Sequence, residues 1–202
     1  ALSLLPNEIK MIESTSKRKN LFIQIILPLI IEENNQIKLN RKKLFSILNK
    51  NNNSKAEKQW LKIKFKQYGV KGNDLSTLKI RMDEVPVSLA IAQAAKETGW
   101  GTSRFALEGN ALFGQWTYSG SGIKPLDAAD DQTHKVMKFK ILKASVRAYQ
   151  RNLNTHSSYR GFRKIRAEMR DNDEKLDSFV LADYLDSYAE TGSEYTLILK
   201  KI

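Results

Sequence analysis

The sequence predicts a mainly α protein with one small β-lobe, and three observations lead to this fold class. Apolar residues recur with helical spacing over most of the 202 residues. Glycine and proline are scarce, at 10 and 4 residues, which argues against a fibrous or low-complexity chain. Only residues 117–141 change to a turn-rich pattern, so we expect a small, irregular β-hairpin there.

Residues 1–84 are interpreted as amino-terminal helices that pack on, or extend, a second domain formed by residues 85–202. The first predicted helix, residues 21–33, carries the longest apolar run of the chain and contains Pro28, which kinks a helix. This run is too short to span a bilayer, so we expect a buried helix. Three more helices are predicted at 38–48, 54–68 and 74–82, with Ser54 and Asp74 as N-caps.

Within residues 85–202 a central helix is predicted from Pro86 to Glu97, apolar on most sides as a buried helix should be. A short helix follows it. Met137, Phe139 and Ile141 then alternate with lysines, which is a strand pattern. Further helices are predicted at 143–153, at 157–170, at 177–190 and from Ser193 onward.

Charge and residue counts exclude several classes of protein. The formal net charge is +12, so the expected partners are anionic: nucleic acid, acidic lipid, or an acidic polymer such as a cell wall. Cysteine is absent, which excludes disulfides and cysteine-ligated zinc. The two histidines, His134 and His156, lack metal-ligand spacing, and no phosphate-binding glycine loop or nucleophile elbow occurs. We expect neither a metal nor another cofactor.

Glu97 is a carboxylate in unusual surroundings, because alanines precede it and Thr-Gly-Trp-Gly follows it. A carboxyl packed against alanines and the indole of Trp100 loses hydration, which disfavours its charged form. Such an environment is typical of a general acid, as for the acidic glutamate beside a tryptophan in lysozyme. Gly99 and Gly101 predict a sharp turn at the lip of a cleft. The residues equally allow a solvated acid at an ordinary helix end, although the helix dipole disfavours a carboxylate there.

The loop after this turn favours a sugar as ligand. It contains Asn110, Phe113, Gln115, Trp116 and Tyr118. Aromatic faces stack on sugar rings, while amides hydrogen-bond to hydroxyl and acetamido groups. The alternative is a hydrophobic plug that closes the core, and it applies most directly to Phe113.

The segment VPVSLAIAQAAKETGWGTSRFALEGNALFGQW resembles the bacterial Bax-like proteins, which belong with the family-73 glycoside hydrolases. The motif E-T-G-W-G followed by N-x-L-F-G carries the resemblance, which continues from Gly122 to Arg166. The family consists of peptidoglycan-cleaving β-N-acetylglucosaminidases, including flagellar and autolysin types. The resemblance therefore implies a lysozyme-like helical fold with a β-lobe.

The resemblance also implies roles for individual residues. Glu97 would be the catalytic general acid that protonates the leaving glycosidic oxygen. Tyr149, on the helix after the β-lobe, would position or support the reacting sugar, with a core tyrosine as the alternative. Tyr159 is a weaker candidate for sugar contact, and Trp100, beside the acid, is included among the substrate-binding residues.

A second carboxylate is expected in the β-lobe, where many of these enzymes have a glutamate. This chain has only Asp127, Asp130 and Asp131 in that stretch, and Asp130 is our first choice and Asp131 our second. Both also fit tight turns. An inverting route, a retaining route and a route assisted by the substrate's 2-acetamido group all stay open.

The sequence thus predicts a monomeric endo-β-N-acetylglucosaminidase that hydrolyses the glycan strands of bacterial peptidoglycan. It is expected in the cell envelope, periplasmic or extracellular, with any export signal upstream of Ala1. No nucleic acid is expected as a partner, because no zinc finger, helix-turn-helix or aromatic strand motif is evident. The alternatives are a muramidase or lytic transglycosylase on the same polymer, and a non-catalytic module that binds glycan or nucleic acid.

Overall fold

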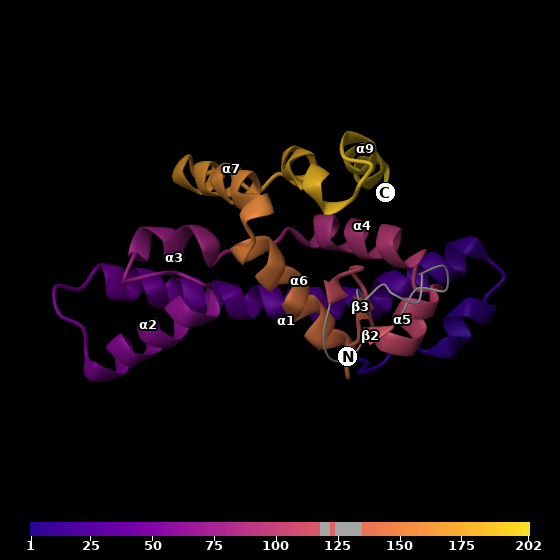
Figure 1. Ribbon diagram of the computed structural model, residues 1–202, viewed down its shortest axis with the longest axis horizontal. Coiled ribbons are helices and arrows are strands. Elements are labelled where there is room, and N and C mark those ends of the chain that lie inside the picture. The colour runs from indigo at the N-terminus through magenta and orange to yellow at the C-terminus, as the bar shows by residue number, and fades with distance from the viewer. Residues whose placement is uncertain (118–121, 124–134) are drawn as a thin grey trace. The chain divides into compact units, whose positions relative to one another are not determined.

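A computed structural model describes residues 1–117, 122–123 and 135–202 (Figure 1). The helices are α1 (Thr15–Leu48), α2 (Lys55–Gln67), α3 (Leu75–Arg81), α4 (Val87–Thr98), α5 (Arg104–Gly109), α6 (Leu142–Thr155), α7 (Arg160–Asp171), α8 (Ser178–Ala182) and α9 (Ser193–Lys201). Short 3-10 helices are η1 (Asn7–Met11), η2 (Ser157–Tyr159) and η3 (Asp183–Tyr188), and the strands are β1 (Trp116–Thr117), β2 (Gly122–Ile123) and β3 (Lys135–Met137). The predicted mainly α fold class is confirmed, and it is consistent with a lysozyme-like helical domain.

Two compact units make up the fold. Unit 1 comprises residues 1–31, 87–149 and 201–202, and unit 2 comprises residues 32–86 and 150–200. Helices α1 and α6 each contribute residues to both units. Each unit therefore contains residues from before and after the domain boundary that was expected at residue 84. The division into amino-terminal helices and a glucosaminidase domain stays a prediction.

Helix α1 is one continuous helix of 34 residues, where two helices were expected. The break expected between these two helices is wrong. Asn34 lies in the middle of the expected gap, and its side chain makes hydrogen bonds to distant residues that allow the helix to continue through it. Its Nδ2 donates to the Val85 carbonyl at 2.7 Å, and its Oδ1 accepts from Gln150 Nε2 at 2.7 Å. The apolar run of α1 is buried as predicted, since Phe22, Ile26 and Ile30 are all 0% exposed. Across the described ranges, no helix is both long and apolar enough to cross a bilayer.

Unit 2 contains a buried cluster of apolar side chains from α1, α2 and the α3 region. The fully or nearly fully buried members are Leu44, Ile47, Leu61, Phe65, Leu78 and Met82. Both predicted N-caps are confirmed: Ser54 forms a capping box with Glu57, and Asp74 Oδ1 accepts from the Thr77 amide. Caps of this kind satisfy amides that have no partner within the helix, so they set where α2 and α3 begin.

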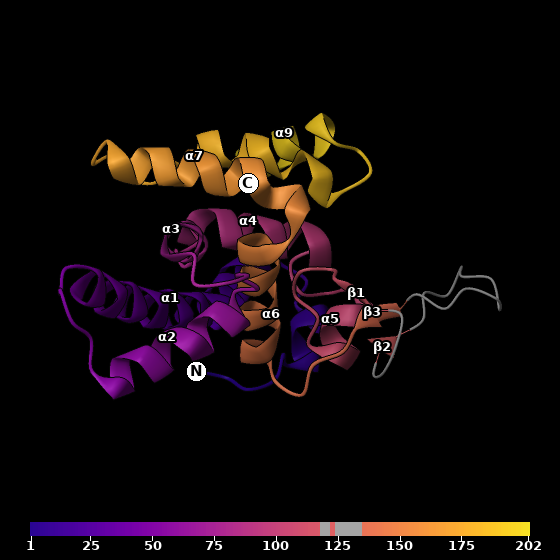
Figure 2. The same cartoon turned by 60° about the vertical axis from the view of Figure 1, so that its left-hand side comes forward.

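The strands form a small antiparallel sheet in the order β1-β3-β2, which Figure 2 shows beside α5. Trp116 pairs with Val136, and Ile123 pairs with Val136 from the other side. The strand expected to continue to Ile141 ends at Met137, so that part of the prediction is wrong. The reason is that the amide of Phe139 donates to the Gly109 carbonyl at 2.8 Å, outside the ladder.

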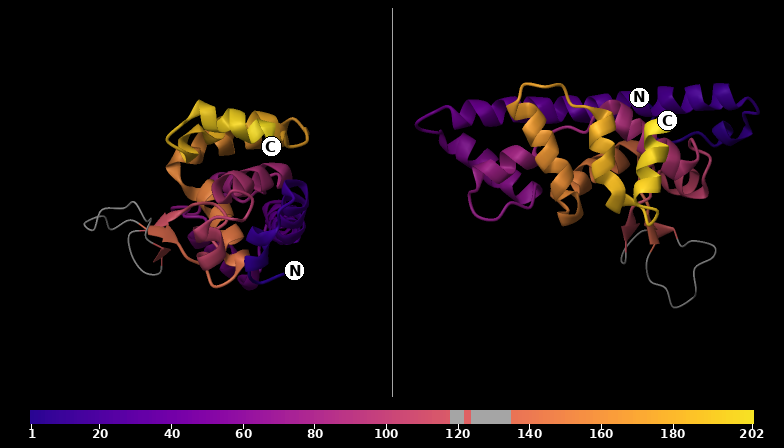
Figure 3. Two further views of the ribbon diagram at one scale, coloured as in Figure 1. Left: turned by 90° about the vertical axis from the view of Figure 1, so that its right-hand side faces the viewer. Right: turned by 90° about the horizontal axis from the view of Figure 1, so that it is seen from above.

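The carboxy-terminal helices of unit 2 pack on one another, and Figure 3 shows them as an orange-to-yellow group. The single helix predicted at 177–190 is divided into α8 and η3. Leu185 has φ −106° and ψ 18°, which are not helical, while its side chain is fully buried. Tertiary packing therefore overrides the helical pattern at this residue.

Candidate active site

Helix α4 carries Glu97 in its last turn. The preceding turn is buried, with Ala94 and Ala95 at 0% and 1% exposure, whereas Glu97 itself is half-buried. A carboxylate in the last turn of a helix is opposed by the helix dipole. Its position is therefore not explained by helix stability.

The turn after Glu97 has an unusual backbone. Gly99, Trp100 and Gly101 follow one another with φ of 55°, 58° and 83°, all in the left-handed region. The Thr98 hydroxyl accepts from the Gly101 amide at 2.9 Å and donates to the Ala94 carbonyl at 2.6 Å, which ties the turn to α4. The sharp turn predicted from the glycines is confirmed.

Trp100 is the strained member of this turn, because a bulky side chain rarely adopts positive φ. Such a conformation costs on the order of 1–3 kcal/mol and occurs preferentially at functional sites. The half-buried indole lies edge-on to Phe22, with ring centroids 6.0 Å apart. Lys19 Nζ lies 4.7 Å from the centroid of the indole.

Gly114, in the following loop, lies close to the Glu97 carboxylate. A Cβ added at Gly114 would lie 2.6 Å from Glu97 Oε2, a separation that real Cβ atoms do not show. Gly114 also has φ 65°, which a side chain disfavours. A side chain at this position would displace the carboxylate and strain the backbone, so the bare loop backbone forms one wall against the acid.

Residues 112–115 of this loop are anchored to α6. The Leu112 amide donates to Ser145 Oγ at 3.0 Å, and Gln115 Nε2 donates to the Ala148 carbonyl at 3.1 Å. The Phe113 ring stacks on Tyr149 with centroids 3.8 Å apart and planes 10° apart. The wall beside Glu97 is therefore held by contacts with α6 on both sides of Gly114.

Tyr149 completes a connection back to α4. Its side chain is 0% exposed, and its hydroxyl donates to Gln93 Oε1. Gln93 is fully buried and precedes Glu97 by four residues, so the two lie on one face of α4. The helix that carries the acid and the loop that faces it are thus joined through Phe113, Tyr149 and Gln93.

Asn110 is occupied by structural contacts. It ends α5 in the left-handed conformation, where its Oδ1 accepts from the Leu5 amide at 3.3 Å and its Nδ2 donates to the Phe139 carbonyl at 3.0 Å. Asn110 is only 8% exposed and Phe113 only 1%, so both lie beneath the surface. Gln115 is half-buried.

The remaining predicted residues fall into two groups. For Trp116 the structure describes the backbone alone, and Tyr118, Asp130 and Asp131 lie outside the described residues, as does Asp127. Tyr159 belongs to unit 2, where it is 6% exposed with its ring 6.1 Å from that of Tyr188.

Sequence reasoning missed Gly114 and Gln93. Gly114 stands inside the quoted N-x-L-F-G motif, and a glycine amid larger residues could have indicated a close backbone approach. Gln93 is a polar residue in an otherwise apolar helix, and a buried amide needs hydrogen-bond partners. Neither signal identifies the partner, which only the tertiary structure supplies.

Comparison with known proteins places the chain in a family. The family model described as "Mannosyl-glycoprotein endo-beta-N-acetylglucosaminidase" matches residues 75–199. The chain therefore belongs to this glucosaminidase family of glycan-cleaving hydrolases. It is a Bax-like member: it is 35% identical over 188 residues to "Protein bax" of Escherichia coli (strain K12), covering 90% of this chain and 67% of that protein. The resemblance seen in the sequence is confirmed. No solved structure matches the chain.

Proposed function

We propose that the protein is an endo-β-N-acetylglucosaminidase that hydrolyses the glycan strands of bacterial peptidoglycan, with Glu97 as general acid. The observation that carries the proposal is the close approach of the Glu97 carboxylate to Gly114, in a loop held by Phe113 and Tyr149. A half-buried acid held against a backbone wall is well placed to donate a proton to a glycosidic oxygen bound beside it. The family match and the cationic chain support an anionic glycan as substrate.

In this mechanism Glu97 donates its proton to the leaving glycosidic oxygen while the bond from that oxygen to the sugar's anomeric carbon breaks. Water then supplies the hydroxyl of the new reducing end. Asp130, or after it Asp131, is proposed as the second carboxylate. Trp100, Gln115, Trp116 and Tyr118 are proposed to contact the sugar. Asn110, Phe113 and Tyr149 are buried in unit 1, so we assign them to the support of the site, whereas Tyr159 is buried in unit 2.

The test is the release of reducing ends from purified peptidoglycan by the wild type and by Glu97→Gln, which keeps the size of the side chain. We expect a loss of about 10²–10⁴-fold in rate, the usual contribution of a general acid. Glu108→Gln is the matched control, because Glu108 is 58% exposed on α5 and paired with Arg104. Full activity of Glu97→Gln with unchanged thermal unfolding would refute the assignment.

Mass spectrometry of the products identifies the bond that is cleaved. A reducing N-acetylglucosamine end supports the proposed glucosaminidase. A reducing muramic acid end would indicate a muramidase, and an anhydro end a lytic transglycosylase. Binding of the polymer without any product would indicate a non-catalytic module.

A further inference from the structure

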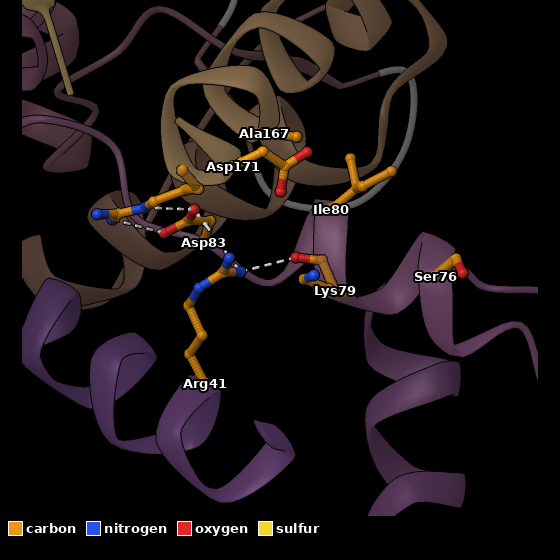
Figure 4. Close-up of a pocket in the computed structure, with 8 residues that line it drawn as sticks. Arg41, Ser76, Lys79, Ile80, Asp83, Ala167 and Asp171 are labelled. Carbon is orange, nitrogen blue, oxygen red and sulfur yellow. Dashed lines mark hydrogen bonds and ion pairs between the residues drawn. The ribbon is translucent and has the colours of Figure 1, made fainter. Parts of the chain in front are cut away.

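Unit 2 contains a second site of interest, a pocket of about 170 Å³ between α1, α3 and α7 (Figure 4). Its lining residues are Arg41, Ser76, Lys79, Ile80, Asp83, Ala167, Arg170 and Asp171. A neighbouring pocket of about 550 Å³ shares Arg41 and Arg170 and adds Lys38, Lys42, Phe45 and Glu84. Two hollows therefore flank the same pair of arginines.

The two arginines are bridged by Asp83, which is 2% exposed. Arg170 donates to both carboxylate oxygens of Asp83 at 3.0 Å, and Arg41 Nη1 lies 3.6 Å from Asp83 Oδ2. Burial alone would raise the pKa of Asp83, but the hydrogen bonds from Arg170 and the charges of Arg166 and Arg41 hold it below its ordinary value. The ionised Asp83 carboxylate therefore pairs with both Arg170 and Arg41.

Positive charge exceeds negative charge around this bridge. Arg166 is fully buried behind it and donates to the carbonyls of Asp83 and Glu84. Burial, and after it the charges of neighbouring arginines, lower the pKa of Arg166 to about 10 despite the opposing effect of Asp83. Three guanidinium groups therefore share two carboxylates, those of Asp83 and Glu84.

Three residues that line the pocket have donors with no hydrogen-bond partner within the described parts of the chain. Arg41 Nη1 donates to the carbonyls of Lys79 and Met82 at 2.7 and 2.9 Å, whereas its Nη2 has no hydrogen-bond partner among the described residues. Lys79 Nζ and the Ser76 hydroxyl likewise have no hydrogen-bond partner among the described residues. Lys79 Nζ lies 5.4 Å from the centroid of the Phe45 ring. A planar carboxylate is bound best by the paired donors of one arginine. Single donors that come from separate residues suit a tetrahedral oxyanion better.

The surrounding sequence would attract such an anion. Residues 38–71 contain eleven lysine and arginine residues and one acidic residue, Glu57, which accounts for +10 of the net +12. A field of this size raises the local concentration of anions. Asp171 is exposed and lines the same pocket, so its charge opposes the binding of an anion there.

We propose that the pocket binds a phosphate group, with Arg41, Lys79 and Ser76 as donors. The neighbouring pocket beside Phe45 would accommodate the organic part of a phosphoester. The site lies within unit 2 and does not depend on the role of Glu97.

Thermal unfolding with inorganic phosphate, at constant ionic strength set by chloride, tests the proposal. We expect a saturable rise in Tm, because a ligand that binds only the folded state stabilises it. Lys79→Gln should weaken the affinity about tenfold or more, as the loss of a charged hydrogen bond does, and Ser76→Ala should weaken it without removing a charge. Asp171→Asn should strengthen it.

Lys66→Gln is the matched control, because it removes the same charge from the adjacent α2 outside the pocket. An equal loss in Lys66→Gln and Lys79→Gln, or no saturable binding to the wild type, would overturn the proposal. The affinity for glycerol 3-phosphate, measured in the same way, distinguishes a phosphoester ligand from free phosphate. Affinity equal to or above that of inorganic phosphate supports a phosphoester, and binding of inorganic phosphate alone supports free phosphate.

Discussion

At the residue scale, the absence of a side chain at Gly114 determines how closely the loop can approach Glu97. We expect Gly114→Ala to reduce glycan cleavage by about 100-fold, because a methyl group 2.6 Å from Glu97 Oε2 must displace the acid. The positive φ adds a stability cost of about 1–2 kcal/mol. Rates on purified peptidoglycan and urea unfolding measure the two effects separately.

Gly72→Ala is the matched control for this substitution. Gly72 has φ 64°, nearly the value of Gly114, but a Cβ there would meet nothing within 4 Å. Both variants should therefore lose similar stability while only Gly114→Ala loses activity. Equal activity in the two variants would show that the contact with Glu97 is unimportant.

Tyr149→Phe separates support of the site from contact with the sugar. Because Tyr149 is fully buried and its hydroxyl donates to Gln93, we expect a stability loss of about 1–2 kcal/mol and a fall in kcat of less than about tenfold. Parallel urea unfolding and kinetics provide the measurement. A loss of activity as large as that of Glu97→Gln would instead assign the hydroxyl to the reaction.

At the scale of elements, the sequence predicted the features that depend on local chemistry. Ser54 and Asp74 begin their helices as expected, and the glycines after Glu97 form the expected turn. The features that were missed depend on residues far apart in the chain. Asn34 keeps α1 helical through Val85 and Gln150, and no local pattern indicates those partners.

In the candidate site, too, the sequence predicted local features and missed contacts between distant residues. Glu97 was found from its neighbours and its motif, whereas the uses of Asn110 as a structural residue and of Gly114 as a wall come from long-range contacts. Hydrogen bonds and steric contacts of this kind carry no sequence period. A single sequence therefore indicates Glu97 as the candidate acid, but not the residues that pack around it.

The turn after Glu97 is itself positioned by α1. A Cβ at Gly101 would lie 2.7 Å from Phe22 Cδ1, and Gly101 has φ 83°. We expect Gly101→Ala to cost about 2–4 kcal/mol, from overpacking together with backbone strain. Because Phe22→Leu makes room for the methyl group, the double variant should be more stable than the sum of the two single losses predicts. Additive losses in urea unfolding would show that the Phe22 contact does not limit this position.

At the scale of the whole molecule, the stability of the protein should depend on pH through Asp83. Its folded-state pKa is below the ordinary value of 3.8, so its ionised form stabilises the fold fully above about pH 4. This stabilisation is lost as the pH falls through the folded-state pKa. At pH 7 we expect Asp83→Asn to be less stable by about 3–5 kcal/mol, because buried arginines lose their partner.

The decisive measurement is the difference in urea stability between the wild type and Asp83→Asn from pH 7 to pH 2. The difference should stay constant down to about pH 4 and narrow below it, since protonation of Asp83 makes the two proteins alike. Glu57, whose pKa is lowered to about 2 by hydrogen bonds at Ser54 and Lys50, titrates in both proteins and cancels in the difference. Asp171→Asn, at an exposed carboxylate of the same pocket, should change stability by less than about 0.5 kcal/mol at every pH. A difference between wild type and Asp83→Asn that persists unchanged to pH 2 would show that packing of the side chain, and not its charge, holds the three arginines.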